Sequence, residues 1–124
     1  MGLKIKIDRR EEGTFTVFLD GPIDSETYII LDKEVEAILS EATRVVIFDM
    51  QGVNYISSMG VSAIIKTRQA VEKNKGLFIM VNLQPQVKKV LEIVAALPEL
   101  SFFAGLDEAD EFIKQKQKDQ EKNQ

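Results

Sequence analysis

The stretch from Thr43 to Val71 reads TRVVIFDMQGVNYISSMGVSAIIKTRQAV and carries the strongest fold signal in this chain. Its apolar run Val45–Phe48 predicts a buried strand that ends in Asp49. Apolar residues at helical spacing predict an amphipathic helix that begins at Ser58. Ser57 and Ser58 would then lie at the positive end of a helix, directly after the carboxyl end of a strand. Proteins with α/β folds often place binding sites at such junctions.

The segments on both sides of this stretch predict one α/β domain. Leu3–Ile7 and Phe15–Leu19 alternate apolar and polar residues around a polar turn at Arg9–Gly13, which predicts an antiparallel hairpin. After the hairpin, helical and strand patterns alternate, and the expected elements are a helix over 26–40, a strand over 45–48, a helix over 58–73, a strand over 77–81, a helix over 84–97, a short edge strand over 100–103 and a helix over 107–114. This order predicts a mixed β-sheet with parallel pairs in its middle and helices packed against it.

The first helix is expected to bury one apolar stripe, made of Ile29, Ile30, Val35, Ile38 and Leu39. Residues 115–124 are polar and low in complexity, so we expect them to form a disordered tail. The single domain would then cover residues 1–114.

The composition of the 124 residues excludes several classes of function. The net charge of −4 argues against binding to the phosphate backbone of a nucleic acid. Because the chain has no histidine and no cysteine, zinc–thiolate sites, thiolate catalysis and Ser-His-Asp triads are excluded. No apolar run approaches the ~20 residues that span a bilayer, and MGLKIKID lacks the continuous apolar segment of a signal peptide. We therefore expect a cytoplasmic, non-enzymatic protein without metal, cofactor or membrane insertion.

The serine pair has a structural interpretation and a functional one. A serine before an amphipathic helix commonly caps it and contributes about 1 kcal/mol. A phosphoryl group on Ser58 would instead add about −1.5 to −2 charges at the helix amino terminus. The fold would tolerate that charge, whereas an apolar partner docked on the same surface would not. The residues alone leave both interpretations open.

The carboxylates near this pair are interpreted mainly as caps. Asp49 could be a metal ligand or a phosphate-relay carboxylate, but capping of the following backbone is favoured. Asp24 is expected to cap the next helix, and it could also lie on the same surface as Ser58. The acidic cluster 107–111 lacks the ligand spacing of a calcium loop. The chain has no GxxxxGK[ST] or GxGxxG motif, so weak nucleotide binding is the least supported hypothesis.

Three segments resemble the STAS-domain family, and specifically its single-domain bacterial anti-sigma factor antagonists. These segments are FLDGPID at 18–24, VVIFDMQGVNYISSMGV at 45–61 and LFIMVNLQPQVKKVLEIVAAL at 77–97. In the family a strand ends in Asp, a loop follows, and a D-S-[ST]-G element opens the next helix. The register of ISSMG places Ser58 on the phosphorylated serine and Gly60 on the glycine. Ser57 replaces the usual acidic residue, and Met59 replaces a small residue.

The resemblance implies a regulatory switch. The partner would be an anti-sigma factor with serine kinase activity, which the unmodified protein captures and which phosphorylation of Ser58, or alternatively of Ser57, releases. A serine/threonine phosphatase would restore the complex. The implied partner-binding residues are Asp24, Asn54, Tyr55, Ile56, Ser57, Met59, Gly60 and Val61. The alternative is a STAS scaffold or adaptor, in a stress-signalling assembly or as the accessory subunit of a lipid transporter, in which Ser58 is merely a cap.

Overall fold

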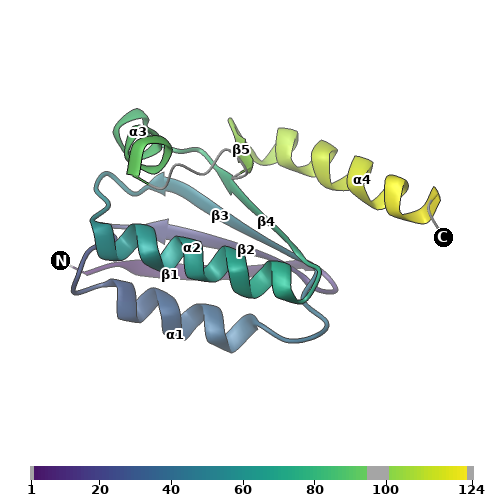
Figure 1. The fold of residues 1–124 in the computed structure, drawn as a ribbon, viewed down its shortest axis with the longest axis horizontal. Helices are drawn as coiled ribbons and strands as arrows, with labels where there is room; N and C mark the ends of the chain where they lie inside the picture. Colours follow the sequence, from purple (N-terminus) through teal and green to yellow (C-terminus); the bar gives the residue numbers. More distant parts are fainter. Residues whose placement is uncertain (1, 95–100, 123–124) are drawn as a thin grey trace.

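Five strands form one mixed sheet in the computed structural model, which describes residues 2–94 and 101–122 (Figure 1). The strands lie side by side in the order of the sequence: β1 (Lys4–Glu11), β2 (Thr14–Asp20), β3 (Val45–Gly52), β4 (Leu77–Val81) and β5 (Ser101–Phe103). β1 pairs with β2 in antiparallel fashion, and the three other pairs are parallel. The helices are α1 (Tyr28–Ile38), α2 (Ser58–Lys73), α3 (Pro85–Val94) and α4 (Leu106–Lys122). The predicted fold, a hairpin followed by βα units, is confirmed.

The central strand β3 is buried on both faces, as its apolar run predicts. Val46, Phe48 and Met50 belong to the main core, to which α1, α2 and α3 contribute. The Phe48 ring meets the Phe78 ring edge to face, with 4.9 Å between their centroids. Because side chains alternate along a strand, Val45 and Ile47 face the other side. There they join a smaller core that α4 covers with Ala109 and Ile113, among others.

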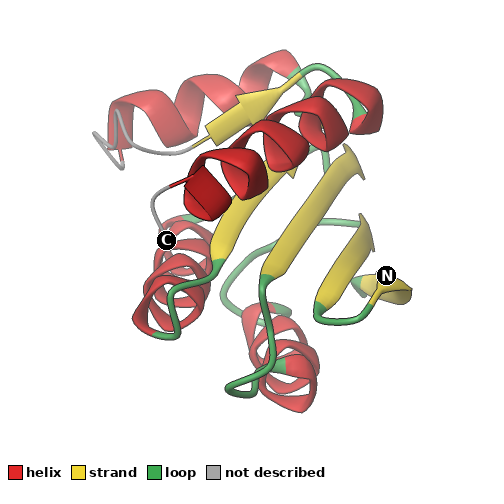
Figure 2. Ribbon diagram, turned by 90° about the vertical axis from the view of Figure 1, so that its right-hand side faces the viewer, coloured by secondary structure: helices red, strands yellow, loops and turns green. Residues whose placement is uncertain are grey.

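The helices therefore occupy two layers. In Figure 2 the sheet lies between α4, near whose end the C-terminus is marked, and the pair α1 and α2. The parallel strands β2 and β3 both run toward the edge at which α1 and α2 begin. The loops that carry the predicted site residues consequently lie together at one end of the sheet (Figure 1).

Two strands are longer than the sequence pattern indicates. β1 runs through the expected turn as far as Glu11, because Asp8, Arg9 and Glu11 still pair with β2, with a register shift at Arg10. The turn is confined to Glu12 and Gly13. The Arg9 guanidinium lies over the ring of Phe15, its partner in β2, 5.0 Å from the ring centroid, and this contact stabilises the end of the hairpin. β3 likewise continues past Asp49 to Gly52, because Gly52 still pairs with Asp20 of β2.

The apolar stripe predicted for the first helix is wrong in part. α1 begins at Tyr28 and ends at Ile38, and it buries Leu31 and Val35, which lie one turn apart on one face. Ile29 and Ile30 are 48% and 40% exposed. The face of α1 that meets the sheet is therefore rotated away from these two isoleucines.

The chain beyond Lys114 is helical rather than disordered as far as Lys122. Its lysine, glutamine and glutamate residues have good helix propensity, and the acidic first turn complements the helix dipole. A side-chain hydrogen bond of 3.3 Å from Gln115 to Asp119 spans one turn of this part. The domain boundary at residue 114 remains a prediction. Residues 95–97 of the expected third helix, and Leu100 of the edge strand, lie outside the described residues.

Candidate functional site

Backbone hydrogen bonds join the loop after β2 to the loop after β3. The Ile23 N–H donates to the Tyr55 carbonyl at 3.0 Å, and the Ser57 N–H donates to the Ile23 carbonyl at 2.9 Å. A parallel bridge between Ile23 and Ile56 results. This pairing places Asp24, the next residue along the chain, beside the start of α2.

The two adjacent serines have different structural roles. Ser57 is the N-cap of α2, with extended backbone angles, and its Oγ accepts a hydrogen bond of 3.3 Å from the Gly60 N–H. Ser58 is the first residue of the helix and is exposed. Within the described residues, no hydrogen bond engages the Ser58 hydroxyl. The cap is therefore Ser57, and not Ser58 as the scaffold or adaptor alternative assumed.

Gly60 allows α2 to start in close contact with the loop after β2. A Cβ atom at this position would collide with the Ile23 carbonyl oxygen and would lie 2.8 Å from Ile56 Cγ1. The glycine is required by this close approach of two backbones. It keeps the start of α2, and hence Ser58, against the segment that leads to Asp24.

Asp24 caps the turn that precedes α1 and not the helix itself, whose N-cap position is Thr27. Its Oδ1 accepts hydrogen bonds of 2.9 Å from the Glu26 and Thr27 N–H groups, and Thr27 Oγ1 accepts one of 2.9 Å from the Asp24 N–H. The hydrogen bonds from the Thr27 and Glu26 backbone lower the pKa of Asp24. The carboxylate is thus engaged locally, while its neighbour Ser25 lines a pocket together with Ser58.

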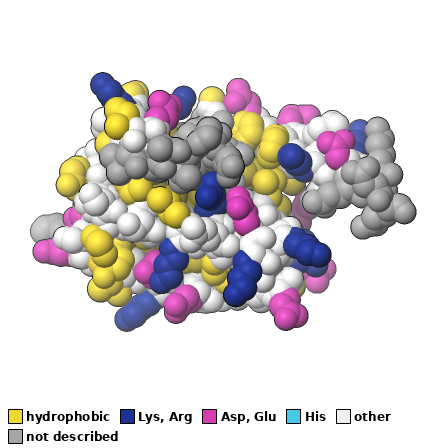
Figure 3. Space-filling view, viewed as in Figure 1, with side chains coloured by type: hydrophobic (Ala, Val, Ile, Leu, Met, Phe, Trp, Pro, Cys, Tyr) yellow, Lys and Arg dark blue, Asp and Glu magenta, His cyan; other side chains and the backbone are white. Residues whose placement is uncertain are grey.

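This pocket has a volume of about 350 Å³ and an apolar border. Tyr55 and Met59, which are 56% and 41% exposed, line it beside Ser58. Exposed Ile29 and Ile30 lie in the first turn of α1. Figure 3 shows hydrophobic side chains at the end of the molecule where α1 and α2 begin. We call the exposed lining residues Ser25, Tyr55, Ser58 and Met59 the Ser58 surface.

The other residues expected to bind a partner divide into exposed and buried ones. Asn54 is exposed, and its carbonyl accepts a hydrogen bond of 3.3 Å from the Gln86 side chain at the start of α3. Ile56, Gly60 and Val61 are buried, so they shape the wall of the pocket and offer little surface to a partner.

The exposure of Ile29 and Ile30 was missed because the sequence interpretation placed both in the core. The available signal was that Leu31 continues the apolar run: Ile29, Ile30 and Leu31 cannot all lie on the buried face of one amphipathic helix.

Asp49 lies on the opposite face of the sheet from the core that packs under α2, and it does not join the Ser58 surface. Its Oδ1 accepts a hydrogen bond of 3.1 Å from the Gln51 N–H, and its Oδ2 accepts one of 3.2 Å from the Asn82 side chain. The local capping that the sequence favoured is confirmed. Among residues 2–94 and 101–122, no group of three or more acidic side chains is placed to hold a metal ion. No helix in this part of the chain is long and apolar enough to span a membrane.

Comparisons with known proteins agree on the family. The model of the STAS domain matches residues 6–109. BtrV, a candidate anti-sigma factor antagonist of Bordetella bronchiseptica, is 26% identical over 91 residues, which cover 73% of this chain and 78% of BtrV.

Solved structures show the same fold. An anti-sigma factor antagonist from Mycobacterium paratuberculosis is 19% identical, with a TM-score of 0.79 over 90% of this chain and 94% of that one. The antagonist SpoIIAA in its unphosphorylated form is 18% identical, with a TM-score of 0.71 over 90% of this chain and 98% of that one. The chain therefore belongs to the STAS-domain family and is a distant relative of the anti-sigma factor antagonists.

Proposed function

We propose that this chain is an anti-sigma factor antagonist that works as a non-enzymatic, cytoplasmic switch. In this proposal the Ser58 surface binds an anti-sigma factor with serine kinase activity, and phosphorylation of Ser58 releases it. The distant relationship to the antagonists supports the class of partner. The observation that carries the switch is the division of roles at α2: Ser57 holds the cap, and Ser58 is exposed with its hydroxyl unengaged within the described residues.

The start of α2 has two features that favour a phosphate on Ser58. A helix begins with backbone N–H groups that have no partner inside the helix, and these groups favour negative charge. Because Ser57 supplies the cap hydrogen bond, modification of Ser58 leaves that bond in place. A phosphate on Ser57 would require its oxygen to carry a bulky group while half buried and bonded to Gly60. Ser58 is therefore the proposed acceptor, with Ser57 as the alternative.

The same phosphate would oppose a bound partner. Tyr55 and Met59 flank Ser58 and are exposed, so a partner that covers them also covers the hydroxyl. A phosphoserine there adds about −1.5 to −2 charges, and burying an unpaired charge costs on the order of several kcal/mol. Such a penalty weakens binding by at least about a hundredfold. A serine/threonine phosphatase that acts on the modified protein would reverse the effect.

The test compares charge at two serines of α2. The partner kinase captured from the host is incubated with ATP and the wild-type protein, and the modified residue is mapped by mass spectrometry. We expect the label on Ser58 and its loss in Ser58→Ala. Ser58→Glu should weaken the complex by at least about tenfold, whereas Ser62→Glu, which adds the same charge one turn further along the exposed side of α2, should not.

Two results would overturn the proposal. One is a label on a different residue. The other is a Ser58→Glu protein that binds the kinase as tightly as the wild type, which would favour the scaffold or adaptor interpretation.

A further inference from the structure

A second pocket lies at the opposite end of the sheet from Ser58. It has a volume of about 250 Å³ and opens beside the first residues of β3 and β4. Val45, Leu77 and Ile113 are its apolar lining. Its remaining lining residues are Arg44, Lys75, Gly76, Lys116 and Gln117. We call it the amino-end pocket.

Three cationic residues from three different segments line this pocket. Arg44 precedes β3, Lys75 precedes β4, and Lys116 belongs to α4. No lining residue is acidic, and within the described residues none of the three cations forms an ion pair with a carboxylate. Arg44 donates a hydrogen bond of 2.8 Å to the Glu41 carbonyl, and the Lys116 ammonium lies 5.5 Å from the centre of the Phe112 ring. In a chain of net charge −4, this is a local concentration of positive charge.

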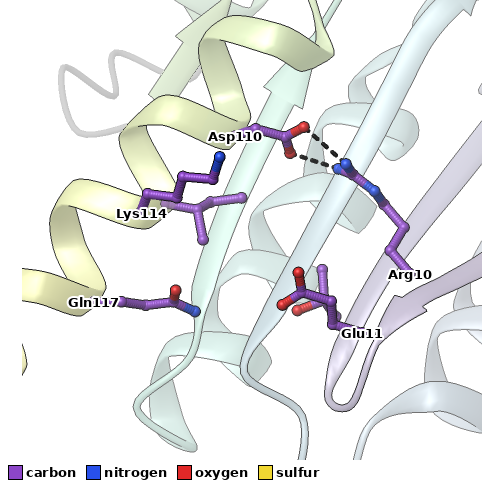
Figure 4. A pocket seen from close by; sticks show the side chains of 7 residues that line it. Arg10, Glu11, Asp110, Lys114 and Gln117 are labelled. Carbon is purple, nitrogen blue, oxygen red and sulfur yellow. Dashed lines mark hydrogen bonds and ion pairs between the residues drawn. The ribbon is translucent and has the colours of Figure 1, made fainter.

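The neighbouring pocket provides a contrast. Figure 4 shows Glu11, Lys114 and Gln117 around a hollow of about 200 Å³, where Arg10 makes two hydrogen bonds of 2.6 and 2.7 Å to Asp110. The two cations of that pocket are balanced by two carboxylates. The two hollows share Ile113 and Gln117 but differ in charge. An anion is therefore favoured in the amino-end pocket and not in its neighbour.

The backbone at Lys75 makes this cation unusual. Lys75 follows the C-cap of α2 and has a φ of 62° in the left-handed region, where glycine or asparagine is the usual residue. Asn74 and Gly76 stand directly beside it, yet the strained position itself is occupied by a lysine. Helix termination does not need the side chain. Lys75 is thus a cation that lines the pocket from a backbone conformation that a lysine seldom adopts.

We propose that the amino-end pocket binds a small anion with a compact apolar group, such as an aryl phosphate or an aryl carboxylate. The apolar lining would take the ring, and Arg44, Lys75 and Lys116 would surround the charged group. The volume of about 250 Å³ lies just below the usual range of ligand pockets, about 300–1,000 Å³, so only a small ligand could be buried there. This site is separate from the Ser58 surface and does not depend on the function proposed for it.

The first test uses phenyl phosphate as the probe and the backbone amide spectrum of the full chain as the readout. We expect saturable shifts at Val45, Gly76 and Leu77, with a dissociation constant on the order of millimolar for so small a ligand. Phenyl carboxylate (benzoate) tests the second head group. Inorganic phosphate, which lacks the ring, and benzyl alcohol, which lacks the charge, should each bind at least about tenfold more weakly. Equal binding of inorganic phosphate, or shifts confined to other parts of the sheet, would overturn the proposal.

The second test removes the lysine without harming the fold. Lys75→Gly suits the left-handed backbone, so its urea midpoint should equal or exceed that of the wild type. Its affinity for phenyl phosphate should fall by about three- to tenfold. Lys73→Gln removes the same charge from the last turn of α2 outside the pocket and should leave the affinity unchanged. If both variants weaken binding equally, the effect is one of net charge, and the pocket is not a site.

Discussion

The first residues of α1 and of α2 lie together at one end of the sheet, but their polar side chains have different roles. Before α1, Asp24 and Thr27 bind each other's backbone, and the Thr27 hydroxyl also donates to the Pro22 carbonyl at 2.8 Å. At α2, Ser57 alone supplies the cap, and the adjacent Ser58 is exposed. Asp24 therefore maintains the shape of its loop, whereas the Ser58 hydroxyl at the start of α2 has no structural role in the described residues.

The largest expected effect concerns the close contact between Gly60, in the first turn of α2, and the loop that leads to α1. Gly60→Val should lower the free energy of unfolding by about 3 kcal/mol or more, because the new side chain meets a backbone oxygen and Ile56 and cannot avoid both by changing its rotamer. Urea unfolding followed by circular dichroism measures this change. Ser62→Val on the exposed side of the same helix is the control and should change stability by less than about 0.5 kcal/mol. A loss below 1 kcal/mol in Gly60→Val would mean that the two backbones separate easily.

A smaller effect separates the two serines. Ser57→Ala removes the cap and should cost about 1 kcal/mol of folding stability. Ser58→Ala removes an exposed hydroxyl and should change stability by less than about 0.5 kcal/mol. Urea unfolding of the two variants, followed by circular dichroism, measures both changes. An equal loss for both would contradict the division of roles described above.

The smallest effect is a pH dependence at the start of α1. Because backbone hydrogen bonds lower the pKa of Asp24 in the folded protein, its stabilising contribution is complete above the pKa of the unfolded chain and is lost as the pH falls through the lower folded value. Asp24→Asn keeps an acceptor oxygen but cannot titrate. The wild type should therefore lose more stability than Asp24→Asn between about pH 5 and pH 2. The measurement is the urea midpoint of both proteins at several pH values in this range. If the midpoints of the two proteins change equally with pH, the charge of the Asp24 carboxylate contributes nothing to stability.

Local patterns predicted most of the fold because they are tied to local physics. The apolar, mostly β-branched run Val45–Phe48 predicted a buried strand, which is β3, and the helix predicted over 58–73 matches α2 at both ends. Its start is marked by a serine cap, and its end precedes Lys75 and Gly76. The same patterns failed where two solutions were locally equivalent: Ile29 and Ile30 continue the apolar run of Leu31, and only packing against the sheet selects which of them is buried.

The sequence by itself determined the order of elements, the mixed sheet, the absence of histidine and cysteine chemistry, and the serine pair at the start of a helix. Only the tertiary structure decided which serine is the cap, because that depends on the backbone angles at Ser57 and on the loop paired with Ile23. It alone also brought Arg44, Lys75 and Lys116 to one pocket, although the first and last are 72 positions apart in the chain. Periodicity reports the environment of one segment, whereas a site made from several segments exists only after the sheet has assembled them.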